Sequence, residues 1–274
     1  MKHKMRFQEF NGDTRCLQLP FYTEGPVVDA AGHVYVTNLQ GGQILRISKE
    51  GVADEWARSS CPNGQMIADN GDHLICDCVE ASVKRFDQRG RFFSTEIAGW
   101  VAQYKITCPN DLVSDGAGGF FFTDSVRHTG AVIHVDHSGR AQLIAAQLDY
   151  PNGIVLDHTL HRLYIAESYQ NRIVMIDLQQ QERKVDVFCN LPQHPSLKET
   201  ANLPDGLALD GYGNVWVAHY GMSCIWKIDP GGSYREKMDT GILLTSNVFL
   251  NDNQVVITGG QAEPGPGYVQ LIQT

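Results

Sequence analysis

Six polar residues stand at equivalent places in six stretches of the chain, each at the start of a short apolar segment. These head residues are Glu24, Asn63, Asn110, Asn152, Asp205 and Asn247. Carboxylate and amide oxygens are hard donors that suit Ca²⁺, Mg²⁺ or Mn²⁺, and Zn²⁺ can also occupy such a site. The head residues are therefore candidate ligands of one divalent cation.

Turn formation is the simpler explanation of the same residues. Asn or Asp followed by Gly is common in tight turns, because the side chain bonds nearby backbone. Glu24 favours the metal interpretation, since Glu has no special preference for turns. Glu24, Asn152 and Asp205 together offer two negative charges, which one divalent ion neutralises; without a cation the two carboxylates would repel each other. We expect these three residues to be the metal ligands.

The elements that must position the head residues form a repeat. Each head begins a short apolar strand, which leads through a turn to a stronger apolar strand, as in Asn152–Asp157 followed by Arg162–Ile165. A third strand and a more polar fourth strand follow in the first five units. The heads are 39 to 53 residues apart, and four short strands in a unit of about 40–50 residues are typical of propeller blades. The sequence predicts an all-β, six-bladed β-propeller.

The last unit provides only three strands before the chain ends at Thr274, the third being residues 268–272. We expect residues 5–19 to supply the missing strand, so that pairing of the N- and C-terminal strands closes the ring and removes open sheet edges. Residues 1–274 would then form one domain. In each blade the first strand lines the central channel and the second runs antiparallel to it, so the heads and the second-strand ends should share one mouth.

The bulk properties narrow the function classes. The formal charge is −9, and no Lys/Arg cluster is dense enough to follow a phosphate backbone, which argues against nucleic acid as a partner. No apolar run approaches 18 residues, so no membrane-spanning helix is expected. The basic start, residues 1–6, is not followed by an apolar stretch, and seven cysteines are scattered without paired spacing. Both features favour a cytoplasmic protein with reduced thiols.

Five short motifs resemble those of the senescence-marker-protein/gluconolactonase family, which includes regucalcin-like proteins and aldonolactonases. They are Thr23-Glu-Gly-Pro, Pro109-Asn-Asp-Leu, Phe122-Thr-Asp, Pro151-Asn-Gly-Ile and Pro204-Asp-Gly-Leu. The resemblance covers all six units, from about residue 21 to residue 272. It implies a metal-dependent lactonase, a hydrolase that opens a small lactone such as an aldonolactone.

The resemblance also implies roles for single residues. Glu24, Asn152 and Asp205 would bind one divalent cation, the same three residues that charge balance selects. Asp205 would act as general base, Asn110 would contact the substrate beside the metal, and Asp111 would lie close behind it. A divalent cation polarises a lactone carbonyl and lowers the pKa of a water, so no covalent nucleophile is needed. No Gly-x-Ser-x-Gly motif is present.

The sequence departs from the family pattern at the substrate side. Sugar-lactone members of the animal type carry an Arg two residues before the third head, where this chain has Cys108. Arg127 and His128, in the loop after residues 120–125, are the alternative candidates for substrate contacts. Two long connections, residues 99–107 and 191–203, precede head residues, and we expect them to form a lid or rim of the mouth.

Two further interpretations stay open. The first is a propeller that binds a ligand or protein partner without catalysis, because fold alone does not fix function. The second keeps the cation but assigns another reaction on a polar small molecule. The sequence determines neither the lactone, nor the native metal (Ca²⁺, Zn²⁺, Mg²⁺ or Mn²⁺), nor the oligomeric state.

Overall fold

The protein is built from strands and short connections. The computed structural model describes residues 5–11, 14–251 and 254–273; the basic residues Met1–Lys4 and two positions within the N-terminal segment 5–19 lie outside them. Two 3₁₀ turns, η1 (Ser168–Gln170) and η2 (Glu199–Ala201), are the only helical elements of the described residues. None of the helical elements in these residues is long and apolar enough to cross a membrane.

Four separate antiparallel sheets contain four strands each. The first holds β3 (Thr23–Val28), β4 (Val34–Asn38), β5 (Gln43–Ile47) and β6 (Ala53–Arg58). The second holds β7 (Pro62–Ile67), β8 (His73–Asp77), β9 (Ser82–Phe86) and β10 (Phe92–Ala98). The third holds β13 (Pro109–Ser114), β14 (Phe120–Asp124), β15 (Gly130–Val135) and β16 (Ala141–Leu148), and the fourth β17 (Pro151–Asp157), β18 (Arg162–Glu167), β19 (Arg172–Asp177) and β20 (Val185–Asn190). A small hairpin, β11 (Trp100–Val101) and β12 (Tyr104–Lys105), lies between the second and third sheets in sequence.

The remaining strands form one nine-stranded sheet. One part holds β21 (Leu203–Leu209), β22 (Val215–Tyr220), β23 (Cys224–Ile228) and β24 (Tyr234–Asp239). The other holds β25 (Leu244–Asn251), β26 (Gln254–Gly260), β27 (Gly267–Gln273), β2 (Thr14–Leu19) and β1 (Gln8–Asn11). A single pairing of Tyr220 with Leu244 joins the two parts.

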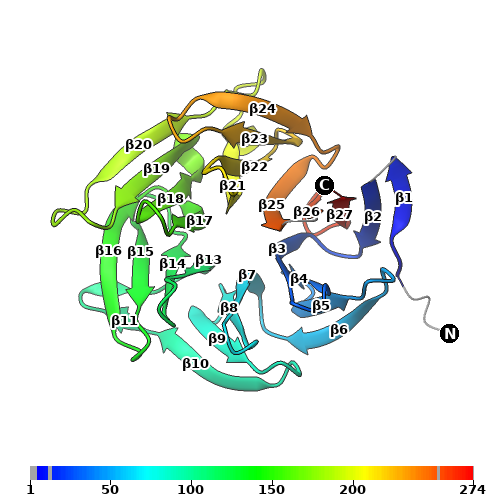
Figure 1. Cartoon of the computed structure of the whole chain (residues 1–274), viewed down its shortest axis with the longest axis horizontal. Coiled ribbons are helices and arrows are strands. Elements are labelled where there is room, and N and C mark those ends of the chain that lie inside the picture. Colours follow the sequence, from blue (N-terminus) through cyan, green and yellow to red (C-terminus); the bar gives the residue numbers. More distant parts are fainter. Residues whose placement is uncertain (1–4, 12–13, 252–253, 274) are drawn as a thin grey trace.

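The predicted all-β, propeller-like architecture is confirmed. The sheets are arranged around a common centre, with the first strand of each set innermost (Figure 1). The fourth strand is outermost except in the set that starts with β25, where β1 lies outside β2. Six separate four-stranded sheets were expected, whereas the structure has four such sheets and the nine-stranded one. The difference arises because the loop between β24 and β25 brings Leu244 into register with Tyr220, which makes two adjacent strand sets continuous.

The N-terminal segment pairs with the C-terminal strand. The β2–β27 ladder runs from Thr14–Ile272 to Leu19–Gly267 without a break in register. β1 then pairs with the outer side of β2, so the segment supplies two strands where the sequence suggested one. Leu17 and Leu19 of β2 are almost fully buried in a cluster that also holds residues of β4, β5, β26 and β27.

Every innermost strand is irregular at its head residue. The register shifts between Glu24 and Val27 in β3, and in the same way near the heads of β7, β13, β17, β21 and β25. Such a bulge bends the strand locally and re-aims the side chains beside it. The head residues therefore lie within irregular strand starts and not in the connecting turns that their Asn-Gly and Asp-Gly pairs suggest.

The glycines that follow several heads permit close approach of neighbouring inner strands. A Cβ atom on Gly25 would lie 2.5 Å from the carbonyl oxygen of Asn63, and one on Gly64 would lie 2.5 Å from a carboxylate oxygen of Asp111. Both distances are shorter than real Cβ contacts, so a side chain would force the strands apart. The missing side chain thus lets β3 approach β7, and β7 approach β13, at their heads.

The β2–β27 contact gives a stability prediction. Leu17→Ala removes a side chain that is 1% exposed and should lower the free energy of unfolding by about 2–5 kcal/mol, the usual cost of a buried Leu-to-Ala change. Gln18→Ala, an exposed position on the same strand, is the matched control. Urea unfolding of both variants measures the difference. Equal midpoints for the two variants would show that β2 contributes little to the core.

Candidate functional site

The head residues lie at the starts of the inner strands, directly beside the ends of the second strands. Pro151 pairs with Glu167 and Pro204 with His219, so the heads Asn152 and Asp205 lie next to second-strand ends, as the repeat predicts. All six heads are buried: Glu24 and Asp205 are each 6% exposed. Below them the inner strands surround a cavity of about 370 Å³.

Glu24, Asn152 and Asp205 come from β3, β17 and β21 and lie within interaction range of one another. The Asn152 amide hydrogen-bonds to the Asp205 carboxylate, and the charge of Glu24 acts directly on Asp205. Tyr22, two residues before Glu24, hydrogen-bonds to the Glu24 carboxylate. The structure thus brings together the three residues that the sequence selected as metal ligands.

The charge balance at these residues is unfavourable. Burial, followed by the negative charge of Asp111, raises the pKa of Glu24 to about 8. Burial, followed by the charges of Glu24 and Asp111, raises the pKa of Asp205 well above its usual value. The strongest charges acting on both carboxyls are therefore negative.

The donor set fits a hard divalent cation. The two buried carboxylates have no neutralising partner among their strongest neighbours. A hard divalent cation would neutralise them and could be bound by their oxygens and by the amide oxygen of Asn152. Among the residues that the structure describes, no three His, Cys, Asp or Glu side chains are grouped to hold an ion. The two observations are compatible, because the third donor of this set is the amide of Asn152.

Asn110 and Asp111 start β13, next to the same group. Asn110 is 7% exposed. The Asp111 carboxylate accepts hydrogen bonds from the backbone amides of Leu112 (2.9 Å) and of Ile154 on the neighbouring sheet (3.2 Å). Burial raises the pKa of Asp111 to about 7. Asp111 therefore links β13 to β17, a use of its carboxylate that the sequence did not indicate.

Arg127 and His128 lie in the loop after β14 and are occupied by structural contacts. The Arg127 Nε lies 2.8 Å from the buried Asp149 carboxylate, a second nitrogen lies 3.5 Å from Glu199, and the guanidinium stacks 3.5 Å from the centre of the Tyr169 ring. The His128 side chain is 71% exposed, and its backbone amide donates to Asp149. Arg127 thus connects its own loop to the 191–203 connection, which contains Glu199.

The carboxylates at the second-strand exits hold loops in place. Asp124, at the end of β14, accepts hydrogen bonds from the Tyr104 hydroxyl (2.6 Å) and from the amides of Thr107 and Cys108. Residues 99–107 are thereby held by β14, the second strand of the sheet that follows them. Asp77 and Glu167 act in the same way on the segments before β7 and β17.

A further polar group, on the loop between β26 and β27, has no signal in the sequence. Glu263 accepts hydrogen bonds from the Tyr220 hydroxyl (2.9 Å) and from Gln40 (3.3 Å). Its negative charge also acts on Glu24 and Asp205, which places it near the metal-ligand candidates. No motif marks Glu263, because it lies in a connection that does not repeat among the units.

The protein belongs to the class of propeller-like folds in which the inner strands bring acidic and amide side chains together at one mouth. The family model described as the SMP-30/gluconolactonase/LRE-like region matches residues 22–259. The chain belongs to this family.

The chain is also similar to one characterised protein in sequence and to two solved structures in fold. The chain is 24% identical over 253 residues to the pentonolactonase XacC of Haloferax volcanii, a match that covers 89% of this chain and 84% of the relative. A gluconolactonase of Xanthomonas campestris has a similar structure, with a TM-score of 0.81, 21% identity and coverage of 99% of this chain and 95% of that one. A calcium-binding protein, regucalcin, from Agrobacterium tumefaciens has a TM-score of 0.76 and 17% identity, covering 92% and 90% of the two chains.

The contacts of Arg127 predict a structural role that can be measured. Arg127→Ala leaves the buried Asp149 carboxylate without its guanidinium partner and should lower the free energy of unfolding. His128→Ala removes only a longer contact with Asp149, 3.4 Å, from a side chain that is 71% exposed, and should change stability less. Urea unfolding at neutral pH compares the two. A destabilisation by His128→Ala as large as that by Arg127→Ala would contradict the assignment.

Proposed function

We propose that this chain is a divalent-cation-dependent lactonase that opens the ring of a small lactone by attack of water. The observation that carries the proposal is the group Glu24, Asn152 and Asp205, two buried carboxylates and an amide whose strongest neighbouring charges are negative. Membership of a family that contains named lactonases supports the reaction class.

Each residue of the group has a chemical task in this proposal. Glu24, Asn152 and Asp205 hold the cation through oxygen atoms. A divalent cation at that position supplies positive charge that polarises the lactone carbonyl and makes a water more acidic. Asp205 takes the proton from the attacking water, because it is the carboxylate that Asn152 orients. Asn110 positions the lactone through its amide, and Asp111 holds the β13 backbone that carries Asn110.

Several finer features belong to the same proposal. The hard donor set favours Ca²⁺, Mg²⁺ or Mn²⁺ over Zn²⁺, and the regucalcin neighbour, described as a calcium-binding protein, supports Ca²⁺. The substrate is a sugar lactone or another small lactone, with Cys108 at the position where an Arg clamp would stand. Cysteines that remain free throughout the chain are consistent with a cytoplasmic location.

We also propose that the whole chain, residues 1–274, counts as one domain of six blades. The nine-stranded sheet divides at the single Tyr220–Leu244 pairing into two radial strand sets, which join the four separate sheets around the centre. The β2–β27 ladder would complete the last blade and close the ring.

The cation proposal predicts ligand-dependent stability. Binding to the folded state alone raises the unfolding free energy by about 2.7 kcal/mol at a hundredfold excess of cation over Kd. Addition of a chelator should therefore lower the melting temperature of the wild type, and should leave that of Glu24→Gln almost unchanged. Glu236→Gln, an exposed change of the same type on β24, is the control and should respond like the wild type. An equal chelator response in Glu24→Gln and the wild type would place the ion elsewhere.

The base role predicts a separation of binding from turnover. Asp205→Asn keeps an oxygen donor but loses the proton acceptor, so its rate should fall by roughly 10²–10⁴-fold, the usual contribution of a general base. Asn110→Ala should retain the cation and show losses in both KM and kcat. Asp54→Asn, on the exposed face of β6, is the matched control.

The assay measures hydrolysis of sugar and non-sugar lactones through the acid that is released. The metal content of each protein is measured by elemental analysis. Near wild-type turnover by metal-loaded Asp205→Asn would remove Asp205 from the base role. A metal-loaded wild type that opens no lactone would leave a non-catalytic binding protein or another reaction class as the explanation.

A further inference from the structure

Three cysteines from distant parts of the sequence lie together at the mouth. Cys61 directly precedes β7, Cys78 directly follows β8 and Cys108 directly precedes β13. The Sγ atoms of Cys78 and Cys61 are 3.0 Å apart, and the Cys78 thiol also hydrogen-bonds to Cys108. All three are partly exposed, whereas Cys76 of β8 is fully buried.

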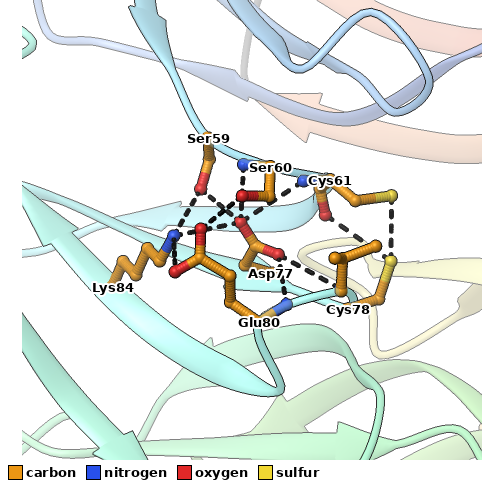
Figure 2. Close-up of polar contacts among 8 residues, drawn as sticks. Ser59, Ser60, Cys61, Asp77, Cys78, Glu80 and Lys84 are labelled. Carbon is orange, nitrogen blue, oxygen red and sulfur yellow. Dashed lines mark hydrogen bonds and ion pairs between the residues drawn. The ribbon is translucent and has the colours of Figure 1, made fainter.

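The backbone around this thiol cluster is held by one buried carboxylate. One oxygen of Asp77 accepts hydrogen bonds from Ser59, from the Ser60 amide (2.9 Å) and from the Cys61 amide (3.3 Å). The other oxygen accepts from the amides of Val79 (3.2 Å) and Glu80 (2.9 Å). Figure 2 shows both segments converging on Asp77, with the two sulfur atoms facing each other beyond it.

Lys84 completes this network and keeps Asp77 charged. Its ammonium group lies 3.1 Å from Asp77, 2.8 Å from Glu80 and 3.0 Å from the Ser59 hydroxyl. The Cys78 amide donates to the Cys61 carbonyl at 3.2 Å, so the two strand ends are also joined directly. The Cys61–Cys78 approach is therefore fixed by the fold on both sides and needs no backbone movement to bring the sulfurs together.

We propose that Cys61, Cys78 and Cys108 form a hydroperoxide-responsive thiol site that ends in a reversible Cys61–Cys78 disulfide. The geometry carries this proposal, since a disulfide bond is about 2 Å long and the two sulfurs already lie within 1 Å or so of that length.

The three thiols differ in their readiness to react. The hydrogen bond from Cys78 lowers the pKa of Cys108 despite its burial, whereas hydrogen bonding and burial raise the pKa of Cys78 to about 12. The hydrogen bond with Cys78 and burial also raise the pKa of Cys61. Since the thiolate is the nucleophile, Cys108 is the first to react.

The reaction balances in three steps. The Cys108 thiolate attacks a hydroperoxide; an S–O bond forms, the O–O bond breaks, and the leaving oxygen takes a proton to give water or an alcohol. Cys78 then attacks the Cys108 sulfenic acid, forming the S–S bond and releasing water. Cys61 displaces Cys108 from Cys78 by thiol–disulfide exchange, which returns the Cys108 thiol. Overall two thiols are oxidised and one hydroperoxide is reduced.

The experiment treats the full-length reduced protein with hydrogen peroxide, alkylates the remaining thiols and maps disulfides by mass spectrometry. Cleavage before Asp69, Asp72 and Asp77 puts Cys61, Cys76 and Cys78 on separate peptides. We expect two of the seven thiols to be lost, a link between the Cys61 and Cys78 peptides, and recovery of all seven with dithiothreitol. No lactone is involved, so the result is independent of the proposed function.

Two variants and a control test the order of events. Cys108→Ser should slow formation of the link by about tenfold or more, because the most acidic thiol is removed. Cys61→Ser should stop the reaction at a Cys78–Cys108 link. Cys16→Ser, a partly exposed thiol on β2, should behave like the wild type. Retention of all seven thiols, links between molecules only, or an unchanged rate in Cys108→Ser would overturn the proposal.

Discussion

The close approach of neighbouring inner strands is the constraint on which the other features of this protein depend. Glycines such as Gly25 and Gly64 leave no Cβ where the next strand's head must pass, and a bulge in each inner strand turns its head inward. The result is an array of buried carboxylates and amides at one mouth. Burial and mutual repulsion then raise the pKa of Glu24 and Asp205, so the same packing that assembles the group also creates its need for positive charge.

Acidic residues serve two opposite purposes at the starts of the inner strands and at the ends of the second strands. Asp205 is buried among negative neighbours, which disfavour its charged form and raise its pKa. Burial alone would also raise the pKa of Asp77, but hydrogen bonds from Ser59, the Glu80 amide and Lys84, with the charge of Lys84, outweigh burial and lower it. A carboxylate that is satisfied by its surroundings fixes loops, whereas one that is left unsatisfied is available for chemistry. The position in the repeat distinguishes these two kinds of carboxylate. Glu24 and Asp205 are heads of inner strands, whereas Asp77 lies at the end of a second strand.

The repeat made much of this arrangement predictable. Each of the six polar heads is followed by two apolar strands. This pattern predicts the inner strands and predicts that Glu24, Asn152 and Asp205 lie at one mouth. Other features depend on contacts that no local pattern reveals. The Gly after four of the six heads suggests a turn, but it is required by a neighbouring strand tens of residues away in sequence. Arg127 was a candidate substrate contact because its loop leaves the mouth, yet Asp149 and Tyr169 occupy it. Cys61, Cys78 and Cys108 have no paired spacing, because three different strand ends bring them together.

The β2–β27 ladder has a consequence for biosynthesis. Its partners, such as Thr14 and Ile272, lie near opposite ends of the described chain, so β2 leaves the ribosome early and must wait for almost the whole polypeptide before its partner emerges. The intervening sheets use hairpin contacts between strands that are adjacent in sequence and can form as they are synthesised. The β2–β27 ladder instead carries the largest loop-closure entropy and should form late. Until then Leu17 and Leu19 of β2 lack the part of their cluster that β26 and β27 supply, which makes the nascent chain a natural client for chaperones during translation.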